Sequence, residues 1–266
     1  MKVYIMTDLE GVTDVVDAAQ MDVEDEATYR RSCENLMLDL NAAVAGAFDG
    51  GATHVAVVDG HGGRTRHNFI LDMLDDRAYY VDRMKEEGRV LDETYAASFA
   101  IGCHAMAGTI NGFLDHTQSS ATIFNWYLNG RKIGEIAQTA LSSAACGVPL
   151  VMVSGDEAAC AEARAFFDPI ETAAVKQGVG RNKAIHYPAD EARARIREAA
   201  RKSLALVGTA RPFAPILPME VKVEFNRSDY CDQYMDRVGV ERLDARTLRW
   251  VTADLRDWHP HRKERR

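Results

Sequence analysis

Apolar residues follow two alternating patterns along most of the chain, short runs of strand-forming residues and longer stretches with helical spacing. Strands are predicted for residues 1–7, 53–58, 95–101, 149–153 and 170–175, with a short strand at 79–81. Helical spacing of three and four connects Tyr29, Cys33, Leu36, Leu40 and Val44, and this helix ends at Gly50–Gly51. Further helices are predicted for residues 135–146, 157–167 and 190–206. The alternation of strands and helices predicts a three-layer α/β/α fold with a largely parallel sheet.

Three segments depart from this alternation. Residues 122–133 form a predicted hairpin, because Asn129–Gly130 is a strong two-residue turn signal. Residues 176–181 predict a glycine-rich loop. After an extended linker with three prolines, residues 219–225 and 247–252 alternate with period two, which predicts half-buried strands. We therefore expect an α/β domain over 1–210 and a smaller α+β lobe over 211–266.

Composition and charge exclude several classes of protein. The 266 residues are 47% hydrophobic and 27% charged, which is typical of a globular protein. A net charge of -8 argues against a nucleic-acid-binding surface, and the short basic tail at 259–266 is predicted to be solvated. No stretch is long enough to span a membrane, and Asp8 and Glu10 interrupt any signal peptide. Five scattered cysteines without a C-x-x-C pair predict reduced thiols and a cytoplasmic protein.

Carboxylates and imidazoles follow several of the predicted strands. Asp8 and Glu10 come directly after the first strand, and their i, i+2 spacing directs both side chains to one side of an extended segment. His61 follows the second strand, and His104 follows the strand at 95–101. His116 lies in the next loop, and Glu135 in the first turn of a helix. In an open α/β sheet, ligands collect at the carboxyl ends of the strands.

Six such side chains at loop positions have the composition of a metal site. Zinc binds imidazole nitrogen and carboxylate oxygen, and two adjacent zinc ions need a bridging carboxylate. Three carboxylates would leave two divalent ions with a net positive charge, which makes them Lewis acidic. Alternatives remain for single residues: Asp8 and Glu10 also suit Mg²⁺ with a phosphate, the histidines also suit ordinary loop positions, and Glu135 also suits a helix N-terminus.

The residues also resemble the zinc-dependent D-aminopeptidases, a family that cleaves peptides with an N-terminal D-amino acid. The most specific matching motifs are DLEGVT at 8–13 and GCHAMAG at 102–108. Further matches, in family order over almost the entire chain, are at 41–44, 59–62, 114–117, 128–131, 134–135, 147–149, 153–156 and 175–181.

The resemblance implies a role for each candidate residue. Asp8 corresponds to the carboxylate that bridges two zinc ions per chain. Glu10 and His61 complete one metal site, and His104 and Glu135 the other. The catalytic histidine of the family corresponds to His116, which lies near the metals without binding them. Lys176 and Arg181 correspond to residues that contact the substrate.

The expected protein is thus a cytoplasmic dinuclear zinc aminopeptidase that releases an N-terminal, D-configured amino acid from short peptides. The resemblance also implies a homo-oligomer, with a decamer-like ring as one form. One alternative is a Mg²⁺-dependent phosphohydrolase with Asp8 as nucleophile, although its usual signature is Asp-x-Asp and this chain has Glu10 as the second acid. The other alternative is a peptide-binding protein of the same fold without turnover.

Overall fold

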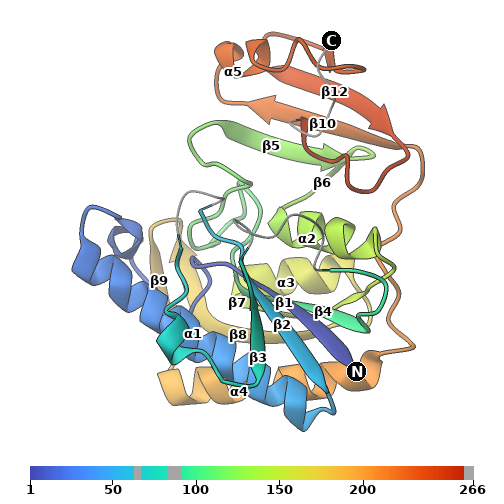
Figure 1. Cartoon of the computed structure of the whole chain (residues 1–266). Helices are drawn as coiled ribbons and strands as arrows, with labels where there is room; N and C mark the ends of the chain where they lie inside the picture. Colours follow the sequence, from blue (N-terminus) through green and yellow to red (C-terminus); the bar gives the residue numbers. More distant parts are fainter. Residues whose placement is uncertain (63–66, 83–90, 261–266) are drawn as a thin grey trace.

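The computed structural model describes residues 1–62, 67–82 and 91–260. Its larger sheet has the strand order β3-β2-β1-β4-β7-β8-β9 (Figure 1). Neighbouring strands are parallel except for the antiparallel pair β8 and β9. The strands are β1 (Lys2–Thr7), β2 (His54–Asp59), β3 (Ala78–Val81), β4 (Ala97–Cys103), β7 (Leu150–Asp156), β8 (Glu171–Gly180) and β9 (Lys183–His186). The predicted parallel sheet is confirmed.

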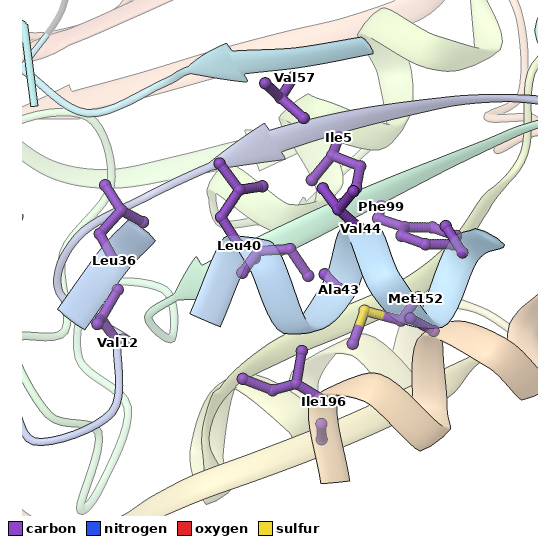
Figure 2. Packing of buried hydrophobic residues seen from close by; sticks show 14 of the residues in the cluster. Ile5, Val12, Leu36, Leu40, Ala43, Val44, Val57, Phe99, Met152 and Ile196 are labelled. Atoms are coloured by element: carbon purple, nitrogen blue, oxygen red, sulfur yellow. The ribbon is translucent and has the colours of Figure 1, made fainter. Parts of the chain in front are cut away.

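Helices cover both faces of this sheet. One face carries α1 (Glu26–Asp49) and α4 (Ala189–Ser203), and the other carries α2 (Glu135–Ala144) and α3 (Glu157–Phe166). Figure 2 shows Leu40, Ala43 and Val44 of α1 between the sheet residue Ile5 and Ile196 of α4. Each fully buried Leu, Ile or Val side chain in this layer contributes roughly 1.5–3 kcal/mol. Single 3₁₀ turns are η1 (Ala18–Met21), η2 (Leu71–Met73) and η3 (Leu204–Leu206).

A second, antiparallel sheet has the order β11-β12-β10-β5-β6 and lies beside α2 (Figure 1). It consists of β5 (Ile123–Leu128), β6 (Arg131–Lys132), β10 (Met219–Phe225), β11 (Glu241–Arg242) and β12 (Thr247–Thr252), with the short helix α5 (Ser228–Asp232). The predicted hairpin is β5–β6, and β5 pairs with β10 through, for example, Val223 and Trp126. The second sheet therefore combines strands from both sides of residue 210. The domain boundary expected at this residue stays a prediction.

Helix α2 packs between the two sheets. Ala137 and Leu141 contact the core of the second sheet, whereas Ile136 and Ala140 pack with β4, β7 and α3. Both faces of the helix are therefore fixed by apolar burial. Its N-terminal residue, Glu135, is held at a defined place above the larger sheet.

Two details concern the sequence-based predictions directly. The prediction of a loop at 176–181 was wrong: β8 continues to Gly180, because its last residues pair with β9. A solvated tail is predicted for residues 259–266, and residues 261–266 of this segment lie outside the described residues. In the part of the chain that the structure describes, no helix combines the length and hydrophobicity that crossing a membrane requires.

Candidate metal centre

Three adjacent strands deliver the central residues of the site. In the order β2-β1-β4, each strand ends in a loop, and these loops carry His61, Asp8 and His104. The pairing of β1 with β4 continues past the strands, since Asp8 N–H donates to the Ile101 carbonyl at 2.7 Å. Parallel strands that end at one edge of a sheet thus place these side chains together, as the sequence predicts.

The first cluster consists of Asp8, Glu10 and His61. His61 Nδ1 lies 3.1 Å from Asp8 Oδ1 and 3.0 Å from Glu10 Oε2. One ligand atom from each of the three residues lies within 4.8 Å of the others, a spacing that suits a single metal ion. Glu10 is buried, and Asp8 is only partly accessible.

The second cluster consists of Asp8, His104 and Glu135, again with ligand atoms within 4.8 Å of one another. His104 Nε2 lies 3.4 Å from Asp8 Oδ2 and 3.3 Å from Glu135 Oε1. Asp8 therefore contacts both histidines, one with each carboxylate oxygen. This is the arrangement expected of a carboxylate that bridges two metal ions.

His104 shows why the clusters fit cations. Its Nδ1 lies 3.0 Å from the Ala105 carbonyl, an acceptor, so Nδ1 carries a proton and Nε2 is the nitrogen that faces the two carboxylates. That Nε2 is buried and lacks a hydrogen-bond partner among the described residues, although two carboxylates face it. A buried nitrogen that faces two carboxylates needs a positive charge, supplied either by a proton on the ring or by a cation between the groups. Although burial opposes protonation, Glu135 and Asp8 raise the pKa of His104 well above its usual value. Imidazole and carboxylate donors are those that zinc binds.

His116 lies at the rim of the two clusters. Its ring stacks on His104, with centroids 3.9 Å apart and planes inclined by 10°. His116 Nδ1 lies 2.8 Å from the Leu114 carbonyl, so Nε2 is directed to the centre, 3.6 Å from Glu135 Oε1 and 3.9 Å from Glu10 Oε1. Glu10, His104 and His116 form a third group with metal-ligand spacing. The geometry thus brings all six predicted residues together.

The electrostatics of the site favour positive charge. Burial alone would raise the pKa of Glu10, but His61 and His104 hold this pKa well below its usual range. Burial alone would lower the pKa of His61, but Glu10 and Asp8 raise it to about 11. Burial also opposes the charge of Glu135, whose pKa His104 nevertheless lowers. Protonated histidines and bound metal ions are alternative ways to supply the cations that these carboxylates need.

A model of the D-aminopeptidase family, peptidase M55, matches residues 1–261. The chain belongs to this family. D-aminopeptidase of Bacillus subtilis strain 168 is 31% identical over 185 residues, which are 68% of this chain and 66% of the relative, just under two thirds of its length. The Zn-dependent D-aminopeptidase DppA from Bacillus subtilis, a self-compartmentalizing protease, matches with a TM-score of 0.86 at 24% identity, over 97% of this chain and 94% of that one. That structural likeness shows the shared fold.

Within this D-aminopeptidase fold, Lys176 has a different place from the expected substrate contact. It lies in β8 and is fully buried. Its Nζ donates to the carbonyls of Glu10, Val12 and Val15 at 2.5, 2.9 and 2.5 Å. An ammonium group has three donors, and all of them are used. Lys176 therefore positions the loop after β1 and has no N–H to offer a substrate.

Arg181 directly follows β8 and has an exposed side chain. Its carbonyl accepts a hydrogen bond from Leu114 N–H at 2.7 Å, which ties it to the loop of His116. It also lines a cavity together with His116. This position is compatible with the substrate contact that family resemblance implies.

Other residues that hold the ligands are not evident from the sequence. Nothing in the sequence around Asn68 indicates a role. In the structure its backbone N–H donates to Asp59 Oδ2 at 2.6 Å, and its Nδ2–H donates to the His61 carbonyl at 3.1 Å. Gln118 N–H donates to Glu135 Oε1 at 2.7 Å. Asp59 stands in a visible motif, but Asn68 and Gln118 have no local signal, because their roles arise from contacts between separate loops.

The buried carboxylate of Glu162 supports the loop after His104. Glu162 Oε2 accepts a hydrogen bond from Met106 N–H at 2.7 Å. Burial raises the pKa of Glu162 to about 7. The loop of a candidate metal ligand thus depends on an acid in α3, a role that the charged pattern of the helix does not indicate.

Proposed function

We propose that this protein is a dinuclear zinc aminopeptidase that releases an N-terminal D-amino acid from short peptides. The observation that carries the proposal is the double contact of Asp8, whose two carboxylate oxygens face His61 and His104 in two adjacent clusters. Membership of the D-aminopeptidase family and the zinc dependence of the structurally similar Bacillus enzyme support it.

In this proposal, Asp8, Glu10 and His61 hold one zinc ion, and Asp8, His104 and Glu135 hold the other. Bound zinc supplies Lewis acidity that polarises the carbonyl of the scissile peptide bond. The protein contributes fixed ligand geometry: His104 keeps its tautomer through the Ala105 carbonyl, and Gln118 fixes the Glu135 carboxylate.

His116 is the proposed catalytic residue. Its Nδ1–H donates to the Leu114 carbonyl, so Nε2 remains available as a base directed at the centre. As a general base, Nε2 accepts a proton from the water molecule whose oxygen attacks the substrate carbonyl carbon, and it then delivers this proton to the amine that leaves when the C–N bond breaks. The stacking on His104 holds the ring in place for both steps.

Assembly and location extend the proposal. The Bacillus relative is a self-compartmentalizing protease, and we propose that this chain also forms a homo-oligomer, with a ring as the expected form, in the cytoplasm. Light scattering coupled to size-exclusion chromatography measures the molar mass directly. A mass of about one 29.5 kDa chain contradicts the assembly.

The decisive experiment compares zinc content and amino-acid release for the wild type, His116→Ala and Glu135→Gln, on paired D- and L-dipeptides. We expect His116→Ala to retain about two zinc ions per chain and to lose turnover, since it removes the base and no ligand. Glu135→Gln should lose zinc. His186→Ala is the matched control, because His186 is exposed and pairs with Asp14 outside the six-residue cluster.

Three outcomes contradict the proposal. A fully active His116→Ala variant removes the catalytic role of His116. Release from L-dipeptides alone contradicts the D-preference. Magnesium as the only co-purifying metal favours the phosphohydrolase alternative, which otherwise leaves His61, His104 and His116 without a function.

A further inference from the structure

A cavity of about 280 Å³ opens directly beside His116. Its walls come from the His116 loop, the β5–β6 hairpin and the end of β8, and they include Asp115, His116, Phe124, Asn125, Lys132 and Arg181. The size is just under the roughly 300–1,000 Å³ of typical ligand pockets. The space on the other side of the centre, beside Asp8 and Glu135, is much smaller, about 30 Å³. The larger cavity therefore has the room for the part of a peptide that follows the scissile bond.

Lys132 supplies a positive charge to this cavity. It is the last residue of β6 and pairs with Tyr127 in the hairpin. Its Nζ lies over Gly108, 3.0 Å from the position that a Cβ at residue 108 would take. Among the described residues, no carboxylate forms an ion pair with Lys132. A half-buried ammonium group without a partner favours an anionic ligand.

The second cation, Arg181, is only partly compensated. Its Nε lies 3.8 Å from Asp115 Oδ1, while Asp115 Oδ2 accepts a hydrogen bond from Gly108 N–H at 2.5 Å. The cavity wall therefore contains two cations, Lys132 and Arg181, and one carboxylate, Asp115, so one positive charge remains. Phe124 is 54% exposed and adds an apolar surface.

We propose that this cavity binds the C-terminal carboxylate of a short peptide, with Lys132 as its main partner and Arg181 as the second. This inference rests on the proposed peptidase function and names the substrate class for it: short peptides with a free carboxylate, in preference to peptide amides. A charge-assisted hydrogen bond gives the carboxylate its advantage, and the apolar wall contacts the adjacent side chain.

The test uses the zinc-loaded enzyme with D-Ala-Gly and its C-terminal amide. We expect a kcat/KM for the free acid roughly 10- to 100-fold above that for the amide, the range for one hydrogen bond to a charged group. Lys132→Gln should remove most of this preference by raising KM for the acid, with little change for the amide. Lys132→Arg should restore the preference, and Lys202→Gln, at an exposed site in α4, should behave as the wild type.

Equal rates for the acid and the amide in the wild type overturn the inference, as does a Lys132→Gln variant that loses activity equally on both. If the wild type cleaves neither compound, the proposed function fails instead. Equilibrium binding of the same two compounds by calorimetry then still decides on Lys132: tighter binding of the acid that Lys132→Gln abolishes supports the inference, and equal binding refutes it.

Discussion

Gly11 determines how closely the loop that carries Asp8 and Glu10 approaches the loop that carries His104. A Cβ at residue 11 would lie 1.9 Å from the Cys103 carbonyl oxygen, whereas real Cβ contacts are essentially never under 3.0 Å. In Gly11→Ala the two loops must therefore separate by about 1.1 Å, the difference between these distances. Metal–ligand distances tolerate only about 0.2 Å.

We therefore expect Gly11→Ala to lose most of its zinc, because Asp8 belongs to both clusters. The overpacked contact should also cost about 1–3 kcal/mol of stability. Zinc per chain is measured by mass spectrometry of the desalted protein, and circular dichroism confirms that the variant is folded. Gly180→Ala is the control, since a Cβ at Gly180 meets no atom within 4 Å. A folded Gly11→Ala protein with the zinc content of the wild type would contradict this role of Gly11.

Two further predictions concern buried charges behind the site. Lys176→Met leaves three backbone carbonyls without their donor. Urea unfolding should therefore show a stability lower by at least about 3 kcal/mol, even though removal of the buried ammonium offsets part of the cost. An unchanged unfolding midpoint contradicts this role of Lys176. Burial raises the pKa of Glu162 from 4.5 to about 7, so its contribution to stability is full below pH 4.5 and is lost as the pH rises through 7. As the pH is raised from 5 to 8, the stability of Glu162→Gln relative to the wild type should therefore increase by about 2–3 kcal/mol, as measured by urea unfolding. A stability difference that does not change with pH contradicts the raised pKa of Glu162.

Local patterns predict the elements that deliver the ligands. The apolar run before Asp8, the helical spacing after Tyr29 and the turn signal at Asn129–Gly130 each depend on neighbouring residues, and each predicted element is present. The ends of parallel strands then bring acids and histidines together by topology alone. This explains why the positions of Asp8, His61 and His104 could be predicted from the sequence.

Long-range contacts could not be predicted in this way. Gly11 suggests a tight turn, but its backbone has no positive φ, and the glycine is needed because Cys103 approaches it. Gly178 suggests a loop, but it lies in β8, where a Cβ would meet the Asn111 carbonyl at 1.9 Å. The sequence places Lys176 in the same glycine-rich segment, and only the fold shows that the loop after β1 surrounds its ammonium group.

The hairpin β5–β6 shows the same distinction at the level of architecture. Its turn signal predicts two paired strands, but their partner, β10, comes almost a hundred residues later. Both are half-buried antiparallel strands, and alternation alone does not say which strands share a sheet. The cavity with Lys132 depends on this pairing, so it also could not be predicted from the sequence.

Anomalous X-ray scattering at the zinc edge, from crystals of the zinc-loaded protein, tests directly whether Asp8 bridges two zinc ions. We predict two zinc peaks about 3.5–4 Å apart, each bonded to one oxygen of Asp8, with His61 beside one and His104 beside the other. A single peak, or two peaks without a shared contact to Asp8, would contradict the dinuclear centre.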